Sequence, residues 1–354
     1  MASDHDTAAV PLDVPGIDVP GVGAWLERHV PGARGPFHYD VIAGGHSNLT
    51  YAVTGADGAR YVLRRPPLGA LLASAHDMGR EHRIIAALAG TTVPVPPALG
   101  LCSDTSVTGA PFYVMAYVDG LVLRDRAAAE AALDEAARRH ASESLVDTLA
   151  ALHGLDPAAV GLGDLGRHDG YIARQLRRWY GQWNAQKTRE LPAIDEVHDR
   201  LIDRIPPQGP ATVVHGDYRL DNTMVDARGE VLAVLDWEIC TLGDPLADIA
   251  LLATYWTGPT DTPNAWQGSA TTAPGFLDRA ALLERYAAVS GRDLGPIRFH
   301  LAFASWKLAC VLEGVYARYL HGAMGSRDPE ELRPFAVQVE RAAEQALEQA
   351  SGLR

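Results

Sequence analysis

The sequence lacks several features that would each indicate a particular class of protein. It holds 3 cysteines in 354 residues, an odd number without metal-ligand spacing, which fits reduced thiols and neither a disulfide framework nor a zinc site. No apolar run reaches the roughly 20 residues that a membrane-spanning helix needs. Basic residues number 31 against 44 acidic ones, for a net charge of −13. We therefore expect a cytoplasmic protein that binds neither nucleic acid nor membrane.

Lysine is almost absent. Only Lys187 and Lys307 occur, so 31 basic residues minus 2 leaves 29 arginines. A phosphate-binding cation in the first half of the chain must therefore be an arginine, whose planar fork binds phosphate through two N–H groups. The acidic excess has two interpretations, which are solubility alone and attraction of a cationic small molecule.

The segment 211–238 carries the most information. Three short apolar runs predict strands at residues 212–214, 223–225 and 231–235. Residues 226–229 supply a hairpin turn between the last two strands. Polar residues follow the first and third of these strands. They are His215, Asp217, Arg219, Asn222 and Asp236.

These residue types at this spacing suit phosphoryl transfer. Asp217 can accept a proton from a hydroxyl nucleophile. Asn222 and Asp236 offer the oxygen ligands that octahedral Mg²⁺ prefers, with phosphate and water in its other positions. Arg219 can point at the transferring phosphoryl group. Any one of these residues also fits a polar turn, but the full set predicts a catalytic site.

Three motifs carry a family resemblance. They are His-Gly-Asp-Tyr-Arg-Leu-Asp-Asn at 215–222, Leu-Asp-Trp-Glu at 235–238 and Gly-Asp-Pro-Leu-Ala-Asp at 243–248. The set resembles the signature of the aminoglycoside phosphotransferase family, the small-molecule branch of the protein-kinase-like fold. It is similar in particular to kinase-like modules related to acyl-CoA dehydrogenase family members. The resemblance implies ATP and Mg²⁺ as cofactors and a role for Asp248 in bracing the catalytic loop.

The resemblance also implies an α+β, protein-kinase-like fold with two lobes. Residues 21–118 are expected to form an N-lobe, an antiparallel β-sheet with one main helix that binds the nucleotide. Residues 119–354 are expected to form a mostly helical C-lobe with the catalytic loop, the metal site and the acceptor pocket. Residues 1–20 have no basic segment, which predicts a disordered tail rather than a secretory signal.

In the N-lobe, strands are predicted at residues 37–43, 49–54 and 59–65. The bend between the first two contains two glycines, and in this fold such a bend covers the ATP phosphates with backbone N–H groups. Two glycines equally fit an ordinary hairpin loop. The candidate phosphate-binding residues of the bend are Gly44, Gly45, Ser47 and Asn48.

The third strand is expected to present a cation to the phosphates, and either Arg64 or Arg65 can do so. Strand alternation places Val62 and Arg64 on one face and Arg65 on the other. We choose Arg64, because Val62 would lie under the adenine. Arg65 is then expected to contribute little to nucleotide binding or to stability.

A helix is predicted over residues 74–90, with a capping-box-like start at Ser74 and Asp77. Glu81 lies on its apolar face, where a carboxylate needs a partner. We expect that partner to be Arg64, and a solvated glutamate is the alternative. Further along, backbone groups near Met115, Tyr117 and Val118 are expected to bind the adenine edge, although each also fits a plain strand end.

The second half of the chain is predicted to be mainly helical. Asp244 is expected to cap a helix N-terminus. One side of the helix expected over residues 297–320 carries Ala302, Trp306, Ala309, Glu313 and Tyr316. In this fold such a helix borders the acceptor pocket, but each residue taken singly is interpreted as part of a core stripe. The other helices are expected at residues 130–152, 171–187, 191–205, 277–290, 297–320 and 329–350.

The sequence therefore predicts an ATP:Mg²⁺-dependent phosphotransferase that moves the γ-phosphate to a hydroxyl of a small molecule. The acceptor is either aminoglycoside-like or a hydroxy acid or hydroxyacyl-CoA, and the protein is expected to be a monomer or homodimer. One alternative is a non-catalytic nucleotide-binding regulatory module of the same fold. A protein kinase is disfavoured, because Asp244 starts a helix so soon after Asp236 that no activation segment fits.

Overall fold

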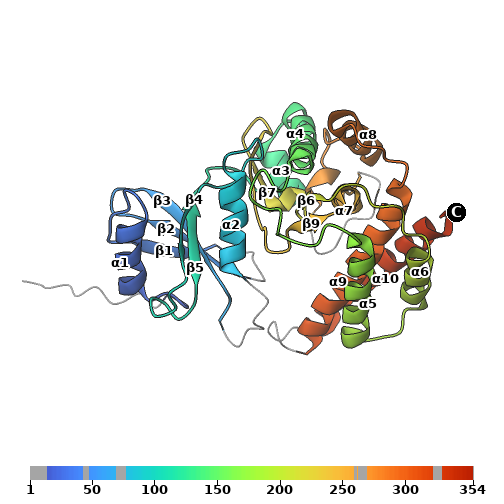
Figure 1. Ribbon diagram of the computed structural model, residues 1–354, viewed down its shortest axis with the longest axis horizontal. Coiled ribbons are helices and arrows are strands. Elements are labelled where there is room, and N and C mark those ends of the chain that lie inside the picture. The colour runs from blue at the N-terminus through green and yellow to red at the C-terminus, as the bar shows by residue number, and fades with distance from the viewer. Residues whose placement is uncertain are drawn as a thin grey trace, which may run out of the picture. The chain divides into compact units, whose positions relative to one another are not determined.

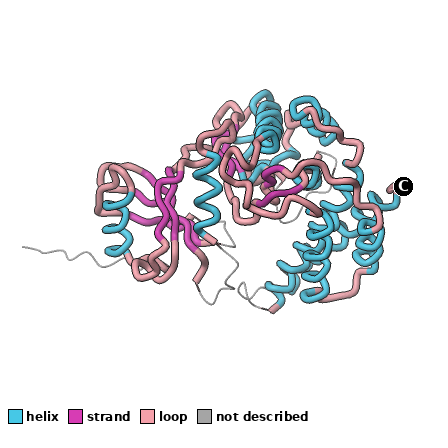
Figure 2. The backbone as a smooth tube through the Cα atoms, viewed as in Figure 1, coloured by secondary structure: helices cyan, strands magenta, loops and turns pink. Residues whose placement is uncertain are grey.

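The structure, a computed structural model, describes residues 14–42, 48–68, 77–258, 261, 269–321 and 329–353. The chain divides into two compact units, Met1–Ala86 with Pro96–Tyr117 and Ala87–Val95 with Val118–Arg354. The first is built on an antiparallel sheet and the second is mostly helical (Figure 2), so the predicted α+β class is confirmed.

In the first unit, one antiparallel sheet has the strand order β1-β2-β3-β5-β4. Its strands are β1 His38–Val41, β2 Leu49–Thr54, β3 Arg60–Arg65, β4 Ala98–Cys102 and β5 Phe112–Ala116. The helices α1 Val19–His29 and α2 Met78–Leu88 lie on opposite faces of this sheet (Figure 1).

Alternation along β3 decides which side chains meet which helix. Tyr61 and Leu63 belong to the apolar core that includes Trp25 of α1. Because successive side chains of a strand point to opposite faces, Val62 and Arg64 lie on the other face, as the sequence predicts.

The start of α2 differs from the prediction. The helix begins at Met78, and the carboxylate of Asp77 accepts a hydrogen bond of 3.0 Å from the backbone N–H of Arg80. Asp77 is thus the N-cap residue, because an N-cap side chain satisfies a free N–H of the first turn. Ser74 lies outside the described residues.

The second unit holds short paired strands among its helices. β6 Thr212–Val214 pairs with β9 Thr241–Gly243, and β7 Thr223–Val225 pairs with β8 Val231–Val234. The helices are α3 Arg126–Ala132, α4 Glu135–Gly154, α5 Tyr171–Gln186, α6 Pro192–Ile202, α7 Pro245–Tyr255, α8 Arg279–Ser290, α9 Ile297–Leu320 and α10 Pro329–Ser351. The short 3-10 helices are η1 Leu220–Asn222 and η2 Ala270–Thr272.

The single helix predicted over residues 130–152 is wrong, since two helices occupy this region. Leu133 adopts an extended conformation with φ −130° and ψ 142°, which ends α3. Asp134 then caps α4, and its carboxylate accepts a hydrogen bond from the N–H of Ala137. An aspartate side chain that accepts this hydrogen bond at the N-cap stabilises a helix more than an aspartate inside the helix does.

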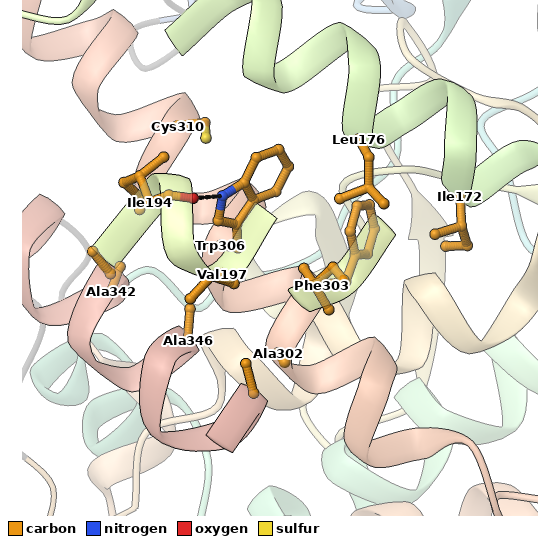
Figure 3. Close-up of a cluster of buried hydrophobic side chains, with 14 of the residues drawn as sticks. Ile172, Leu176, Ile194, Val197, Ala302, Phe303, Trp306, Cys310, Ala342 and Ala346 are labelled. Atoms are coloured by element: carbon orange, nitrogen blue, oxygen red, sulfur yellow. Dashed lines mark hydrogen bonds between the residues drawn. The ribbon is translucent and has the colours of Figure 1, made fainter. Parts of the chain in front are cut away.

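The main core of the second unit joins α5, α6, α9 and α10. Trp306 is fully buried there, and its indole N–H donates a hydrogen bond of 3.0 Å to the carbonyl of Ile194 (Figure 3). Ala302 and Ala309 are also fully buried, so the core interpretation is confirmed for these three residues. Glu313 is buried as well, whereas Tyr316 is only partly buried. The packing fixes α9, which carries Lys307.

Candidate active site

The predicted catalytic loop, residues 215–219, runs from the end of β6 to η1 and is held by the first turn of α7. The Asp248 carboxylate accepts hydrogen bonds from the backbone N–H groups of His215, at 2.6 Å, and Gly216, at 2.9 Å. This is the brace that the resemblance implies for Asp248. Asp244, also as predicted, caps α7 by accepting a bond of 3.0 Å from the N–H of Leu246.

The imidazole of His215 ties the same loop to the end of β8. Its Nε2 lies 2.8 Å from the carbonyl oxygen of Leu235, and its Nδ1 accepts a hydrogen bond of 3.3 Å from the N–H of Asp217. This pattern assigns the proton to Nε2. His215 is fully buried beside Trp237, with ring centroids 4.7 Å apart. The ring therefore fixes where Asp217 leaves the loop.

A second histidine contacts Asp248, the residue that holds the predicted catalytic loop. His153, at the end of α4, lies between Asp248 (3.4 Å from Nε2) and the hydroxyl of Tyr286 (2.7 Å from Nδ1). Burial lowers the pKa of His153, although Asp248 opposes that effect. Burial alone would raise the pKa of Asp248, but hydrogen bonds from His153 and the Gly216 N–H help to hold it below its ordinary value. The pair is thus a neutral imidazole on a carboxylate.

Asp217 stands within a set of charged and polar side chains. Its Oδ2 lies 3.3 Å from Nε of Arg219 and accepts a hydrogen bond of 3.1 Å from Nδ2 of Asn222. Nη1 of Arg219 lies 3.1 Å from Oδ2 of Asp221. Burial lowers the pKa of Arg219, and nearby acidic groups led by Asp217 more than offset this, so that it lies above its ordinary value. Arg219 is therefore a permanent cation shared between two carboxylates.

The two candidate metal ligands are brought together by the β7–β8 hairpin. The N–H of Leu235 donates a hydrogen bond of 2.8 Å to the carbonyl of Asn222, so Asp236 follows directly beside it. The amide nitrogen of Asn222 donates to the carbonyl and the carboxylate of Asp217, so the amide oxygen is the candidate ligand atom. Asp236 has φ 62° and is the one non-glycine residue with positive φ among those described.

These donors fit Mg²⁺, because a carboxylate and an amide oxygen are hard ligands. The left-handed backbone of Asp236 is the kind of local strain that persists at functional sites when the surroundings enforce it. Over the described part of the chain, no group of three or more His, Cys, Asp or Glu side chains forms a metal site by itself. A cation held by Asn222 and Asp236 would have coordination positions left for other oxygen ligands, such as those of phosphate or water.

The predicted ion pair in the first unit is confirmed. Nε of Arg64 lies 3.4 Å from Oε2 of Glu81, which is 1% exposed. The hydroxyl of Tyr113 donates to Oε2 at 3.0 Å, and Nδ2 of Asn48 donates to Oε1 at 3.2 Å. The prediction did not include these two contacts. They assign the amide nitrogen of Asn48 to Glu81, although the sequence suggested a phosphate for this side chain.

Arg65 is not the dispensable residue that the sequence suggested. It is 5% exposed, and its guanidinium donates hydrogen bonds to the carbonyls of Gly16, Thr108 and Pro66. It therefore fastens the segment before α1 and the β4–β5 connection to the sheet. These contacts revise the expectation about stability. Removing Arg65 would leave buried carbonyl groups without their donor, so we now expect Arg65 to stabilise the fold.

The other nucleotide-binding candidates are only partly described. Met115 is 7% exposed and pairs with Val62 across β5 and β3. Tyr117 follows β5, and its ring lies 3.5 Å from the guanidinium carbon of Arg60. Val118 begins the main segment of the second unit. The candidates that lie outside the described residues are Gly44, Gly45 and Ser47.

Comparison with known proteins assigns the family. The model of the phosphotransferase enzyme family matches residues 38–300. The chain belongs to the phosphotransferase enzyme family. Acyl-CoA dehydrogenase family member 11 of Gallus gallus is 36% identical over 335 residues, which cover 92% of this chain and 42% of that protein. The chain thus spans less than half the length of this relative.

Solved structures of the phosphotransferase family share the fold. A putative aminoglycoside phosphotransferase from Ralstonia eutropha is 33% identical with a TM-score of 0.79, covering 95% of this chain and 99% of the other. A ternary complex of aminoglycoside phosphotransferase APH(4)-Ia with AMP-PNP and hygromycin B has a TM-score of 0.60 at 15% identity, covering 94% and 99%. At that identity the second likeness shows the fold alone.

Two residues of this family member contact the catalytic loop and were not predicted. Nζ of Lys307 donates a hydrogen bond of 3.0 Å to the carbonyl of Gly216, and burial lowers the pKa of its ammonium. The ring of Tyr255, the last residue of α7, lies beside Arg219, with its centroid 5.3 Å from the guanidinium carbon. The scarcity of lysine was the one available signal for Lys307.

Across the helices of the described chain, none has the length and apolarity to span a membrane.

Proposed function

We propose that the chain transfers the γ-phosphate of ATP to a hydroxyl group of a small molecule, with Mg²⁺ as the metal. The observation that carries this proposal is the joint arrangement of Asp217, Asn222 and Asp236. One backbone hydrogen bond, Leu235 N–H to Asn222 O at 2.8 Å, brings the two metal-ligand candidates together. The amide of Asn222 then reaches Asp217, so base and metal ligands form one unit.

Each of these side chains has a definite task in the proposal. Asp217 orients the acceptor hydroxyl and takes its proton. Asn222 and Asp236 hold Mg²⁺, which when bound neutralises charge on the phosphate oxygens. Arg219 contributes positive charge beside the transferring group while it remains paired with Asp217 and Asp221.

Residues of the first unit are proposed to bind the nucleotide. Arg64 offers a guanidinium to the phosphates, and Glu81 with its partners Asn48 and Tyr113 fixes the orientation of that guanidinium. Backbone groups at Met115, Tyr117 and Val118 are proposed to bind the adenine edge, and Gly44, Gly45 and Ser47 to cover the phosphates. The neighbour solved with AMP-PNP supports nucleotide use by this fold.

The class of acceptor separates two versions of the proposal. Aminoglycoside-like acceptors are supported by the neighbour solved with hygromycin B. Hydroxy acids or hydroxyacyl-CoA thioesters are supported by the similarity to an acyl-CoA dehydrogenase family member. We place the reaction in the cytoplasm, carried out by a monomer or homodimer. The second candidate function, a nucleotide-binding regulatory module without catalysis, is disfavoured because Asp217, Asn222 and Asp236 are all present.

The experiment is a screen for ADP release with Mg·ATP against cationic antibiotics, hydroxy acids and hydroxyacyl-CoA thioesters. Asp217→Asn should lower kcat on the acceptor found by roughly 10²–10⁴-fold while ATP binding persists, since a general base contributes about that much. ATP binding without phosphorylation of any acceptor would favour the regulatory module. Near-wild-type turnover by Asp217→Asn would show that Asp217 is not the general base.

A further inference from the structure

Lys307 carries an ammonium group on a helix whose nearby core residues are apolar. Phe303, Trp306 and Cys310 of α9 all belong to the main core of the second unit. Lys307 itself is only 8% exposed, and a charged group that leaves water costs free energy unless partners compensate for it. A methionine would fill the same space without that cost. Packing alone therefore does not account for an ammonium at this position.

The contacts of the ammonium point to the predicted catalytic loop. Nζ of Lys307 donates a hydrogen bond of 3.0 Å to the carbonyl oxygen of Gly216. The ring centroid of Trp179 lies 5.6 Å from Nζ, within the range of a cation–π interaction. Burial lowers the pKa of Lys307, and the charges of Asp217 and Asp248 oppose that effect. Of these interactions the hydrogen bond is the directional one.

Gly216 is the most permissive point of the loop. Its φ is 85°, a conformation that glycine adopts readily, together with many others. Both of its polar backbone groups have a side-chain partner. The Asp248 carboxylate accepts from the N–H at 2.9 Å, and Lys307 donates to the carbonyl at 3.0 Å. These partners come from α7 and α9, which pack against each other, so the glycine is held in one conformation by two helices.

The carbonyl that Lys307 holds belongs to the peptide group that leads into Asp217. At the other end of this group, the N–H of Asp217 donates a hydrogen bond of 3.3 Å to Nδ1 of His215. Because a peptide group is planar, contacts at its oxygen and at its nitrogen together fix the orientation of the whole plane. The plane ends at the Cα atom of Asp217, so its orientation positions the atom from which the carboxylate projects.

We propose that Lys307 is a positioning residue, which holds the Gly216 carbonyl and thereby keeps the Asp217 carboxylate in its place beside Asn222. The inference rests on the proposed function, because it takes Asp217 as the group that orients the acceptor. Lys307 itself neither gives nor takes a proton in the reaction.

The test uses the full chain with Lys307→Met, which removes the ammonium and keeps a side chain of similar length. Lys187→Met is the matched control, because Lys187 is the other lysine of the chain and pairs with Glu190 at 2.8 Å in an exposed position. The first readout is an NMR correlation between glycine labelled with ¹³C at its carbonyl and aspartate labelled with ¹⁵N. Such a correlation arises only where an aspartate directly follows a glycine. The sequence has three such pairs, at residues 163–164, 216–217 and 243–244.

The correlation of residues 216–217 is identified by its loss in Asp217→Asn. It should shift in Lys307→Met, because the carbonyl loses a charged donor, and stay in place in Lys187→Met. The correlation of residues 163–164 should stay in place in both variants, as an internal check on the fold. An unmoved 216–217 correlation in Lys307→Met would overturn the proposal. If Lys307→Met does not fold, Lys307→Gln takes its place, and the same shift is expected because its shorter, neutral side chain loses or lengthens the hydrogen bond.

The second readout is the release of inorganic phosphate from Mg·ATP with water as the acceptor. Lys307→Met should lower kcat roughly 10- to 100-fold, since a small displacement of a positioned group costs about that much, with KM for ATP changed less than about twofold. In an Asp217→Asn background the same change should have no further effect. An unchanged kcat, or an equal loss in both backgrounds, would show that Lys307 does not act through Asp217 and would overturn the proposal. Because the NMR correlation does not depend on turnover, failure to find any phosphorylated acceptor would count against the proposed function alone.

Discussion

At the scale of single residues, Asp236 combines a negative charge with a left-handed backbone. Asparagine tolerates positive φ at least as well as aspartate, whereas alanine does not. Asp236→Asn should therefore keep the melting temperature and lose the Mg²⁺-dependent part of ATP affinity, while Asp236→Ala should lose both. Calorimetric titration of ATP with and without Mg²⁺, beside thermal melts, measures the two effects. Equal ATP affinity of Asp236→Asn and wild type in both conditions would contradict the metal-ligand role.

Arg64 and Arg65 are neighbours on opposite faces of β3, and we expect them to have different roles. Arg64→Ala should weaken ATP binding and lower the melting temperature, because buried Glu81 loses its cation. Arg65→Ala should leave ATP affinity unchanged and destabilise the fold by about 3 kcal/mol, since it strips buried carbonyls of a charged donor. Titration calorimetry and thermal unfolding of both variants test this. If Arg65→Ala weakened ATP binding as strongly as Arg64→Ala, our assignment of the two faces would be wrong.

The residue contacts that the sequence could predict are those governed by local periodicity. Arg64 meets Glu81 because strand alternation and helical spacing, both readable from the sequence, turn them to the same side. Tyr255 and Lys307 reach the catalytic loop across long sequence separations, and no periodic rule connects them to it. The contacts of Arg65 were missed for the same reason, since its carbonyl partners at Gly16 and Thr108 are 49 and 43 positions away.

At the scale of elements, the β7–β8 turn packs directly on helix α4. Gly229 has φ +89°, and a Cβ there would lie 2.1 Å from the carbonyl oxygen of Ala137 and 2.7 Å from the N–H nitrogen of Ala141. Gly58 offers a matched control, with φ +81° and nothing within 4 Å of an added Cβ. Both glycines adopt a backbone that alanine disfavours, but only one of them is also sterically enclosed.

Gly58→Ala should therefore cost about 1–2 kcal/mol of unfolding free energy from backbone strain alone. Gly229→Ala should cost at least about 3 kcal/mol, because backbone atoms of α4 must also move. Denaturant unfolding of the two variants gives the comparison. Equal losses would mean that the hairpin can shift away from α4 without penalty.

Elements were predicted where a pattern was strong and missed where it was short. The β7–β8 hairpin follows from two apolar runs around a glycine turn. β9 was missed, because Thr241–Gly243 is too short to show alternation. The break before α4 was missed because apolar periodicity continues through Asp134, and only its hydrogen bond to Ala137 distinguishes a cap from a helix interior.

At the scale of the whole molecule, one buried network couples several parts of the second unit. His153 of α4 joins Tyr286 of α8 to Asp248 of α7, and Asp248 holds the catalytic loop. Two members of this network, His153 and Asp248, can bind a proton as the pH falls. The folded-state pKa of His153 lies below the ordinary 6.5 and that of Asp248 below 3.8. In each case the unfolded chain therefore binds the proton at a higher pH than the folded chain does.

Stability should therefore decrease on acidification in two windows. The contribution of His153 is fully present above about pH 6.5 and is lost as the pH falls from there toward its folded-state pKa, with a slope of at most about 1.4 kcal/mol per pH unit. The contribution of Asp248 is lost below about pH 3.8. Calorimetric melts from pH 8 to pH 5 should show a shallower decline for His153→Gln than for wild type. Parallel curves would show that His153 does not titrate on unfolding.

The burial of Lys307 also has a practical consequence for chemical labelling. Its ammonium is enclosed against Gly216, whereas the Lys187 ammonium lies near the surface beside Glu190, with 27% of its side chain exposed. Since the chain has no other lysine, an amine-reactive dye or surface linker finds one accessible lysine side chain, just after α5. Conjugation through lysine therefore attaches the folded protein at a defined point and leaves the lysine beside the catalytic loop unmodified.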